Sequence, residues 1–155
     1  MNASKQAFEI RSARQEDIPS LADLCTQLGY PTSPQELVQR LPAISTLPDQ
    51  LILVALDSNL TVVGWVHAFI YRVLESEPMV EIGGLVVDQD ARGQGAGGGL
   101  LAAVEDWAIA QGIEVVSLRS NIMRVEAHEF YRHLGYTVPK TQFMFRKHLS
   151  SGRRT

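Results

Sequence analysis

Apolar side chains recur along this chain with two periods, one typical of helices and one typical of strands. A stripe spaced three and four residues apart predicts a helix that begins after Asp17 and ends at Gly29. The run Ser33-Pro34-Gln35-Glu36 combines a capping box with proline at the first helical position, and it predicts a second helix ending at Pro42. Two further stripes predict helices over residues 97–111 and 124–134.

Strands are predicted where β-branched and aromatic residues cluster between turn signals. The turn Asp57-Ser58-Asn59 joins two such runs into a hairpin. The element order is then β-α-α-β-β-β-α-β-α-β, which predicts an α/β domain with a mixed sheet instead of a strictly alternating, doubly wound one. The predicted strands cover residues 8–11, 51–56, 61–71, 79–88, 114–120 and, in one or two pieces, 137–147.

Composition narrows the function classes. A chain of 155 residues with 45% hydrophobic and 20% charged residues is typical of one globular domain, and residues 148–155 are interpreted as a flexible tail. A net charge of -3 argues against a nucleic-acid partner, because such proteins concentrate basic residues on one face. No window approaches the ~18 apolar residues of a membrane span, and the first ten residues lack a signal-peptide core. We therefore expect a cytoplasmic protein with no membrane partner.

The glycine-rich segment 88–99 joins a predicted strand to a predicted helix. Glycine lets the backbone approach a ligand closely, and the first turn of a helix presents unpaired N–H groups at the positive end of its dipole. Such a turn favours a phosphate or pyrophosphate, and Arg92 adds a permanent positive charge. The alternative is a tight turn without a ligand. The run from Gly97 to Gly99 weakens the helix, however, and a turn without a ligand has little reason to carry that loss of stability.

The sequence argues against two other kinds of nucleotide-binding site, a dinucleotide site and a P-loop. Gly93, Gly95 and Gly98 match the spacing GxGxxG, but a dinucleotide site needs an acid at the end of the next strand, and Glu114 falls at that strand's start. The sequence GxxxxGK of a P-loop does not occur.

The same turn resembles the acyl-CoA-binding motif of the GNAT acetyltransferases, Gln/Arg-x-x-Gly-x-Gly/Ala, through Arg92-Gly93-Gln94-Gly95-Ala96-Gly97. Downstream, Asn121 followed by Ala127-x-x-Phe130-Tyr131-x-x-x-Gly135-Tyr136 is similar to the family's second signature. The resemblance is strong over residues 79–136 and weaker over the rest of the chain.

The resemblance implies a GNAT-like fold and a cofactor. The fold would be a mixed, mostly antiparallel sheet flanked by about four helices, and splayed between strands 79–88 and 114–120. Acetyl-CoA would bind there as a cosubstrate, and no metal is needed. Its pantetheine would pair with the backbone at Leu85, Val86 and Val87, and its pyrophosphate would rest on Arg92, Gly93, Gln94, Gly95, Ala96, Gly97 and Gly98.

Two residues are candidates for proton transfer. Glu81 shares a face with Gly83, Leu85 and Val87 by the two-residue period of a strand, and a carboxylate among apolar residues suggests a function. It also resembles the general base of the histone-acetyltransferase branch. By the resemblance, Tyr131 would protonate the coenzyme A sulfur. The alternative for Glu81 is an acid at a strand end that solvent reaches. The alternative for Tyr131 is a tyrosine that packs in the core.

Three further residues have open interpretations. Asn121 resembles a cofactor-contacting asparagine or is a turn residue, and Arg124 would meet a coenzyme phosphate or a surface carboxylate. His67, with Trp65 and Phe69, could line the acceptor pocket, but such a histidine is more often a hydrogen-bonded sheet residue.

The function that the sequence favours is N-acetylation of a primary amine on a small molecule, by direct attack in a ternary complex. The alternatives are acetylation of a protein or peptide amine, a non-catalytic acyl-CoA sensor, and a nucleotide-binding regulatory module. Members of the family are often dimers, so a homodimer is a prior expectation.

Overall fold

The structure is a computed structural model that describes residues 7–150. The chain divides into two compact units, with the boundary between Arg119 and Ser120, and each unit is described here by itself. Because the final residues of the expected tail, 151–155, lie outside the described residues, that expectation stays a prediction.

A single mixed sheet forms the centre of the first unit. Its strands follow the order β1-β2-β3-β4-β5, with antiparallel pairing from β1 to β4 and parallel pairing between β4 and β5. The mixed, mostly antiparallel sheet predicted from the sequence is confirmed. The strands are β1 (Glu9–Ser12), β2 (Gln50–Leu56), β3 (Val62–Val73), β4 (Ser76–Val87) and β5 (Val116–Leu118).

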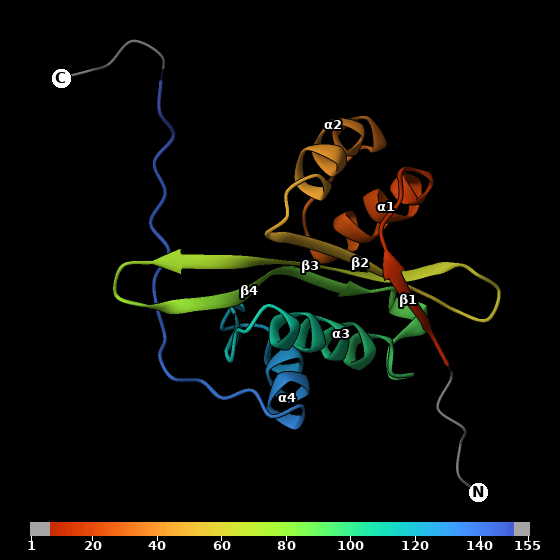
Figure 1. The fold of residues 1–155 in the computed structure, drawn as a ribbon. Coiled ribbons are helices and arrows are strands. Elements are labelled where there is room, and N and C mark those ends of the chain that lie inside the picture. Colours follow the sequence, from red (N-terminus) through yellow and green to blue (C-terminus); the bar gives the residue numbers. More distant parts are fainter. Residues whose placement is uncertain (1–6, 151–155) are drawn as a thin grey trace, which may run out of the picture. The chain divides into compact units, whose positions relative to one another are not determined.

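Helices cover both faces of this sheet. Figure 1 shows α1 (Ile18–Leu28) and α2 (Pro34–Ser45) on one face and α3 (Ala96–Ala110) on the other. Val54 and Leu100 are fully buried, and the burial of each side chain contributes about 1.5–3 kcal/mol to the free energy of folding. The apolar stripes read from the sequence therefore face a core on each side of the sheet. Two short 3-10 turns, η1 (Gln15–Asp17) and η2 (Gln89–Ala91), complete the unit.

The second helix continues past the residue that was expected to end it. Pro42 lies inside α2, which extends to Ser45. Proline lacks the N–H that would bond to the preceding turn and its ring crowds that turn, but the C-terminal turn of α2 is closed by other donors. The backbone N–H and the hydroxyl of Thr46 both donate to the Pro42 carbonyl, at 3.3 and 2.9 Å.

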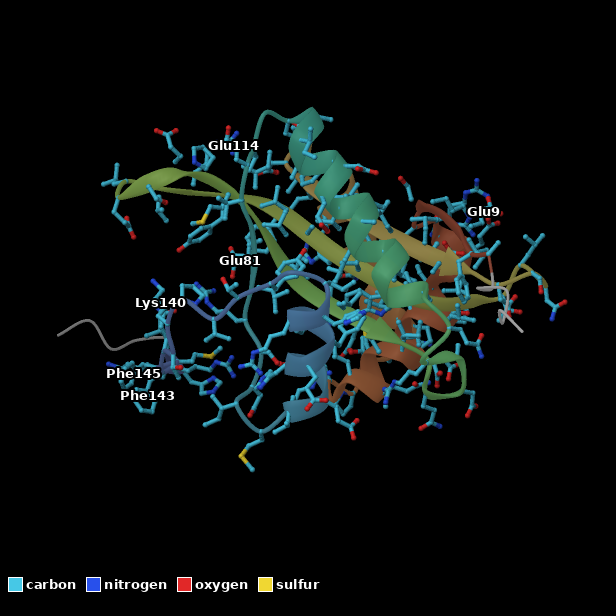
Figure 2. All side chains as sticks on the ribbon, turned by 90° about the horizontal axis from the view of Figure 1, so that it is seen from below. Glu9, Glu81, Glu114, Lys140, Phe143 and Phe145 are labelled. Atoms are coloured by element: carbon cyan, nitrogen blue, oxygen red, sulfur yellow. The ribbon has the colours of Figure 1, made fainter. Side chains whose placement is uncertain are left out.

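The second unit contains α4 (Val125–His133), close to the helix predicted there. The expectation of strands over 137–147 is wrong, because residues 137–150 form no helix or strand. A strand needs a neighbour for its backbone groups, and α4 is the one regular element that this unit offers among its described residues. Phe143 and Phe145 are consequently 90% and 93% exposed (Figure 2).

Candidate active site

The sheet of the first unit opens along one half of β4. β5 pairs with β4 only at Val80, Glu81 and Ile82. Beyond Ile82, no strand among residues 7–150 pairs with this edge of β4. The splay expected between these two strands is therefore present, and it begins directly after Glu81 and Ile82.

A β-bulge lies where the sheet opens. His67 pairs with Gly84 and Ala68 with Ile82, so Gly83 is the extra residue. A Cβ atom on Gly83 would lie 3.3 Å from the Phe69 ring, and one on Gly84 would lie 2.8 Å from the Trp65 ring. Both glycines therefore face the side of the sheet that carries the aromatic residues of β3.

This bulge corrects the expected alternation along β4. Because directly opposite residues of an antiparallel pair share a face, Glu81 lies with Phe69, while Leu85 lies with Val66 on the other face. The sequence analysis placed Glu81, Leu85 and Val87 together, which is wrong beyond Gly83. The extra residue shifts the two-residue period by one position.

The free edge of β4 presents main-chain groups at two positions. The Asp88 N–H donates to the Val63 carbonyl at 2.7 Å, which makes these residues a hydrogen-bonded pair. Bonded and non-bonded pairs alternate in an antiparallel ladder, so the backbone groups of Val87 and Leu85 point away from β3. Those of Val86 point toward β3. The edge is thus equipped to pair with an extended ligand through Leu85 and Val87.

The edge leads directly into the glycine-rich turn. Gly93 and Gly95 have φ values of 78° and 102°, in the left-handed region that favours glycine. Gly95 is the N-cap of α3, so the helix begins at Ala96 and directs its unpaired N–H groups at this turn. The predicted glycine-rich turn and helix start are therefore present, and the binding of an anion at residues 93–98 stays a prediction.

The charged group of this turn is folded against β4. Arg92 Nε donates to the Val87 carbonyl at 3.2 Å. This contact keeps the guanidinium beside Val87, at the end of the free edge. The role of Arg92 as a counter-charge for a phosphate stays a prediction.

Comparison with known proteins identifies the family. A model of the acetyltransferase (GNAT) family matches residues 16–136. The chain belongs to the GNAT acetyltransferase family.

Relatives of this GNAT protein include an uncharacterized N-acetyltransferase of Bacillus subtilis (strain 168), which is 31% identical over 85% of this chain and 89% of its own length. The aminoalkylphosphonate N-acetyltransferase of Salmonella typhimurium is 44% identical over 44% of each chain. Among solved structures, the aminoglycoside antibiotic 6'-N-acetyltransferase of Acinetobacter baumannii superposes with a TM-score of 0.79 at 19% identity, over 93% of this chain and all of its own, and so shares the fold.

Glu81 is the buried carboxylate beside the opening of this GNAT sheet. It is only 6% exposed, and its Oε1 forms an ion pair with Arg119 Nη1 at 2.8 Å. Figure 2 shows Glu81 on β4. The structure therefore supplies the partner that a buried carboxylate needs. Arg119 was missed in the sequence analysis, because its proximity to Glu81 depends on the parallel register of β4 and β5.

His67 is a hydrogen-bonded sheet residue, the interpretation that the sequence favoured, but it also faces the bulge. Its Nε2 lies 2.7 Å from Gln50 Oε1 on β2, and burial lowers the pKa of its imidazole from the ordinary 6.5. Its ring centroid is 5.8 Å from that of Phe69. Gln50 was not singled out from the sequence, because only the β2–β3 register brings it to His67.

The second unit of the GNAT protein holds the other predicted residues. Asn121 Oδ1 accepts from the Met123 N–H at 2.9 Å, so the side chain serves the turn before α4, and Arg124 is the helix N-cap. Burial raises the pKa of the Tyr131 phenol above its ordinary 10, and Arg124 partly offsets this. Tyr131 is therefore protonated at neutral pH.

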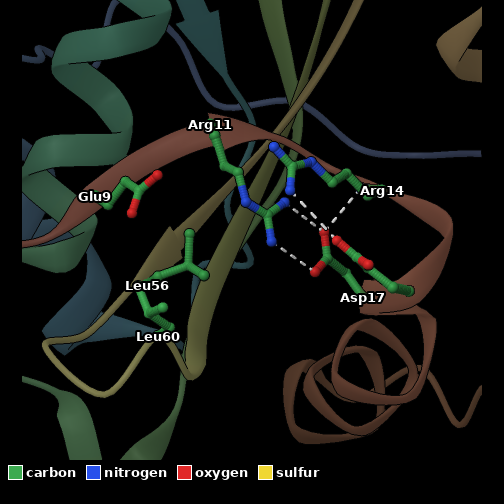
Figure 3. Close-up of a pocket in the computed structure, with 7 residues that line it drawn as sticks. Glu9, Arg11, Arg14, Asp17, Leu56 and Leu60 are labelled. Carbon is green, nitrogen blue, oxygen red and sulfur yellow. Dashed lines mark hydrogen bonds and ion pairs between the residues drawn. The ribbon is translucent and has the colours of Figure 1, made fainter.

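One pocket of the first unit lies away from the free edge of β4, at β1. It has a volume of about 360 Å³ and is held by the bidentate pair of Arg11 with Asp17, at 2.8 and 2.9 Å (Figure 3). The Arg14 N–H also donates to Asp17 Oδ2 at 2.8 Å. The side chain of Asp17 therefore fixes the segment before α1, and it makes no capping hydrogen bond to α1, although Asp17 is the N-cap residue.

Metal-ligand clusters and membrane-spanning helices are both absent from the part of the chain that the structure describes. Residues 7–150 contain no group of three or more His, Cys, Asp or Glu arranged to hold a metal ion. Within the same range, every helix is too short or too polar to cross a membrane.

Gly98 offers a direct test of the anion site. A Cβ atom there would meet nothing within 4 Å, so the protein itself does not require glycine at this helical position. We expect Gly98→Ala to raise the free energy of unfolding without ligand by up to about 1 kcal/mol, because alanine is the better helix former. The same change should weaken acetyl-CoA binding, because the added methyl group hinders the approach of a phosphate to the backbone. Chemical denaturation and calorimetric titration measure the two effects.

Gly99→Ala is the matched control. Its Cβ would make an ordinary contact of 3.8 Å with Ile10 Cδ1, one residue further into the helix. It should stabilise the protein to a similar extent and leave the affinity for acetyl-CoA much closer to that of the unaltered protein. Equal affinities of all three proteins would contradict a ligand at Gly98.

Proposed function

We propose that this GNAT protein transfers the acetyl group of acetyl-CoA to the primary amine of a small molecule. The amine attacks the thioester directly while both substrates are bound. The observation that carries the proposal is the continuity of the free β4 edge with the glycine-rich turn and the start of α3. An extended chain ending in a pyrophosphate matches this arrangement of backbone donors and acceptors.

Coenzyme A would use the two parts of this surface differently. The pyrophosphate would accept from the N–H groups of residues 94–98, beside Gly93 and the guanidinium of Arg92. The pantetheine arm would pair with the backbone of Leu85 and Val87, whereas Val86 would contribute its side chain. Asn121 and Arg124 remain candidates for coenzyme contacts, on the strength of the second signature.

The orientation of the cofactor follows from the chain direction. The phosphate site comes after Val87, so a pantetheine arm running back along β4 carries its thioester toward Gly83 and Gly84. These residues have no side chains, and Gly83 is exposed. The bulge would therefore leave room for an acceptor amine to reach the carbonyl carbon.

The reaction needs three contributions from the protein: stabilisation of an oxyanion, acceptance of a proton and donation of a proton. A backbone N–H on the free edge of β4 would stabilise the oxyanion of the tetrahedral intermediate. Glu81, held by its ion pair with Arg119, would accept a proton from the attacking nitrogen, directly or through water. As the carbon–sulfur bond breaks, Tyr131 would donate its proton to the departing thiolate.

Two findings favour a small acceptor. The relative in Salmonella is named for an aminoalkylphosphonate, and the structural neighbour in Acinetobacter for an aminoglycoside; both names describe small molecules that carry amines. The buried acid at the bulge is already paired with Arg119, so its charge alone does not demand a polycationic partner. We further expect the protein to act in the cytoplasm, and a homodimer remains a prediction.

The test is an acetyl-transfer assay with the purified protein. Acetyl-CoA is mixed with a panel of aminoalkylphosphonates, aminosugars, amino acids and peptides, and the release of free thiol is followed together with the mass of the acceptor. Amine-dependent thiol release with a gain of one acetyl group supports the proposal. Acetyl-CoA binding without any transfer would favour a sensor, and the absence of binding would overturn the cofactor site.

A further inference from the structure

His67 occupies a bridging position at the bulge. The residue lies on β3, between β2 and β4, and its ring extends toward both neighbours. Nε2 is 2.7 Å from Gln50 Oε1 on β2. Nδ1 lies on the other side, 3.4 Å from the position that a Cβ of Gly83 would occupy. The imidazole therefore connects the amide of β2 with the glycine that lacks a side chain on β4.

The hydrogen bond to Gln50 selects one tautomer. The amide oxygen of Gln50 can only accept, so Nε2 of His67 must carry the hydrogen in this pair. In the neutral ring, Nδ1 then holds a free lone pair. Burial lowers the pKa of the ring, so this neutral form dominates at neutral pH. Gln50 thus leaves a proton acceptor directed at Gly83, which is an exposed residue.

We propose that His67 is a catalytic residue of the acetyl transfer: its Nδ1 takes the proton that the acceptor ammonium must lose, and Gln50 is its positioning residue. This inference rests on the proposed function, because the thioester is expected at Gly83 and Gly84. It assigns the site a second proton acceptor in addition to Glu81.

The proton balance requires two such acceptances. A primary amine reaches the enzyme mainly as R–NH₃⁺, which loses one proton to His67 and becomes a nucleophile. A carbon–nitrogen bond then forms as the amine attacks the thioester, and the nitrogen loses its second proton to Glu81. The carbon–sulfur bond breaks and the thiolate takes a proton from Tyr131, which recovers one of the two protons. The other is released to water, so the reaction yields amide, thiol and one proton.

Among residues 7–150, no charged group near His67 is positioned to take this proton in place of the imidazole. On β4 the acid of the same face is Glu81, which is paired with Arg119. Burial is the cause of the lowered pKa of His67, and no charged neighbour contributes to it. The other titratable or charged residues on these elements are Tyr71 and Arg72 on β3, Glu77 on β4, Cys25 and Asp23 on α1, and the exposed pair of Glu36 with Arg40 on α2.

The first experiment removes the imidazole. In the unaltered protein, the acid limb of kcat/KM should follow the His67 imidazole, whose pKa lies below the ordinary 6.5, and its position should not move with the pKa of the acceptor amine. In His67→Ala, only the free-base fraction of the amine reacts. We expect kcat/KM at pH 7 to fall by about 10²-fold, and its rise with pH to follow the pKa of each amine tested. Added imidazole should restore part of the rate.

The second experiment alters the partner and preserves the ring. In Gln50→Glu, a carboxylate at Nε2 stabilises the imidazolium, so the acid limb of kcat/KM should move to higher pH by about one unit or more. Gln50→Leu removes the hydrogen bond that fixes the tautomer of His67. It should lower kcat with little change in the KM for acetyl-CoA. Thermal melting and acetyl-CoA titration of each variant establish that the fold and the cofactor site are intact.

The outcomes separate this inference from the proposed function. Variants of His67 and Gln50 that fold, transfer acetyl groups and keep the pH profile of the unaltered protein would overturn the role of His67 alone. Loss of activity in His67→Ala without rescue, with an unmoved acid limb in Gln50→Glu, would reduce His67 to a structural residue. Absence of transfer by the unaltered protein would overturn both.

Discussion

Replacing Tyr131 with phenylalanine is expected to lower kcat by about 10²–10⁴-fold, the range for loss of a general acid. The change removes one hydroxyl group and keeps the ring, whose centroid lies 5.3 Å from Phe130 and 6.1 Å from Tyr136. The KM for acetyl-CoA should change little, because the hydroxyl is used when the carbon–sulfur bond breaks. Steady-state kinetics with the acceptor identified by the transfer assay measure both constants.

The pH profile gives a second readout of this change. The pKa of Tyr131 is raised above 10, so the phenol is a proton donor throughout the neutral range and loses that capacity only at higher pH. The alkaline limb of kcat should therefore disappear in Tyr131→Phe. Tyr136→Phe, which removes a hydroxyl from the other aromatic residue of the signature, is the control. Equal rates for Tyr131→Phe and the unaltered protein would show that the thiolate is protonated by another group or by water.

Asp17→Ala is expected to have the largest effect on stability. The carboxylate is 5% exposed and accepts from both Arg11 nitrogens and from the Arg14 N–H. Its removal leaves a guanidinium that is 17% exposed without its partner. We expect the free energy of unfolding at pH 7 to fall by about 3 kcal/mol, the lower end of the range for breaking a buried ion pair, because Arg11 retains some solvent.

Glu16→Ala is the matched control next to it. The pair of Arg14 with Glu16 is 3.4 Å long, with side chains that are 62% and 68% exposed, so its loss should change the free energy of unfolding by less than about 1 kcal/mol. Urea denaturation of both variants gives the comparison. Equal losses in the two variants would show that burial of Asp17 adds nothing to its ion pair.

The dependence of this effect on pH has a definite sign. Burial raises the pKa of the Asp17 carboxyl, but the hydrogen bonds from Arg11 and Arg14 and their charges outweigh it, so the pKa lies below the ordinary 3.8. The stabilisation by Asp17 is then fully present above the unfolded pKa, and it is lost as the pH falls through the folded one. The difference between the unaltered protein and Asp17→Ala should shrink correspondingly in acid.

The sequence predicted those features that depend on local pattern. The capping box at Ser33, the glycine that ends α1 and the turn before α3 each depend on residues close together in the chain, and all are present. The helix past Pro42 was missed because proline disrupts only one bond of a helix that other contacts maintain. The strands expected over 137–147 had a suitable pattern, but a pattern does not supply a partner strand.

The active site was predicted less completely, for a related reason. The glycine-rich turn is a continuous motif, and it was found. The contacts of Glu81 with Arg119 and of His67 with Gln50 join residues on different strands, and their formation depends on register. The adjacent glycines Gly83 and Gly84 were a usable signal for the bulge, because glycine inside a strand often marks one.

The extra residue at Gly83 also determines how this strand should be redesigned. A library that varies every second position of β4 would change one side of the sheet before the bulge and the opposite side after it. Of the residues on the His67 side, Gly83 is the exposed one, whereas a Cβ at Gly84 would lie 2.8 Å from the Trp65 ring and Val86 is buried; Ile82, Leu85 and Val87 lie on the side of the sheet covered by α3. An engineer who counts along the sequence alone would disrupt the packing beneath α3 while trying to change the substrate.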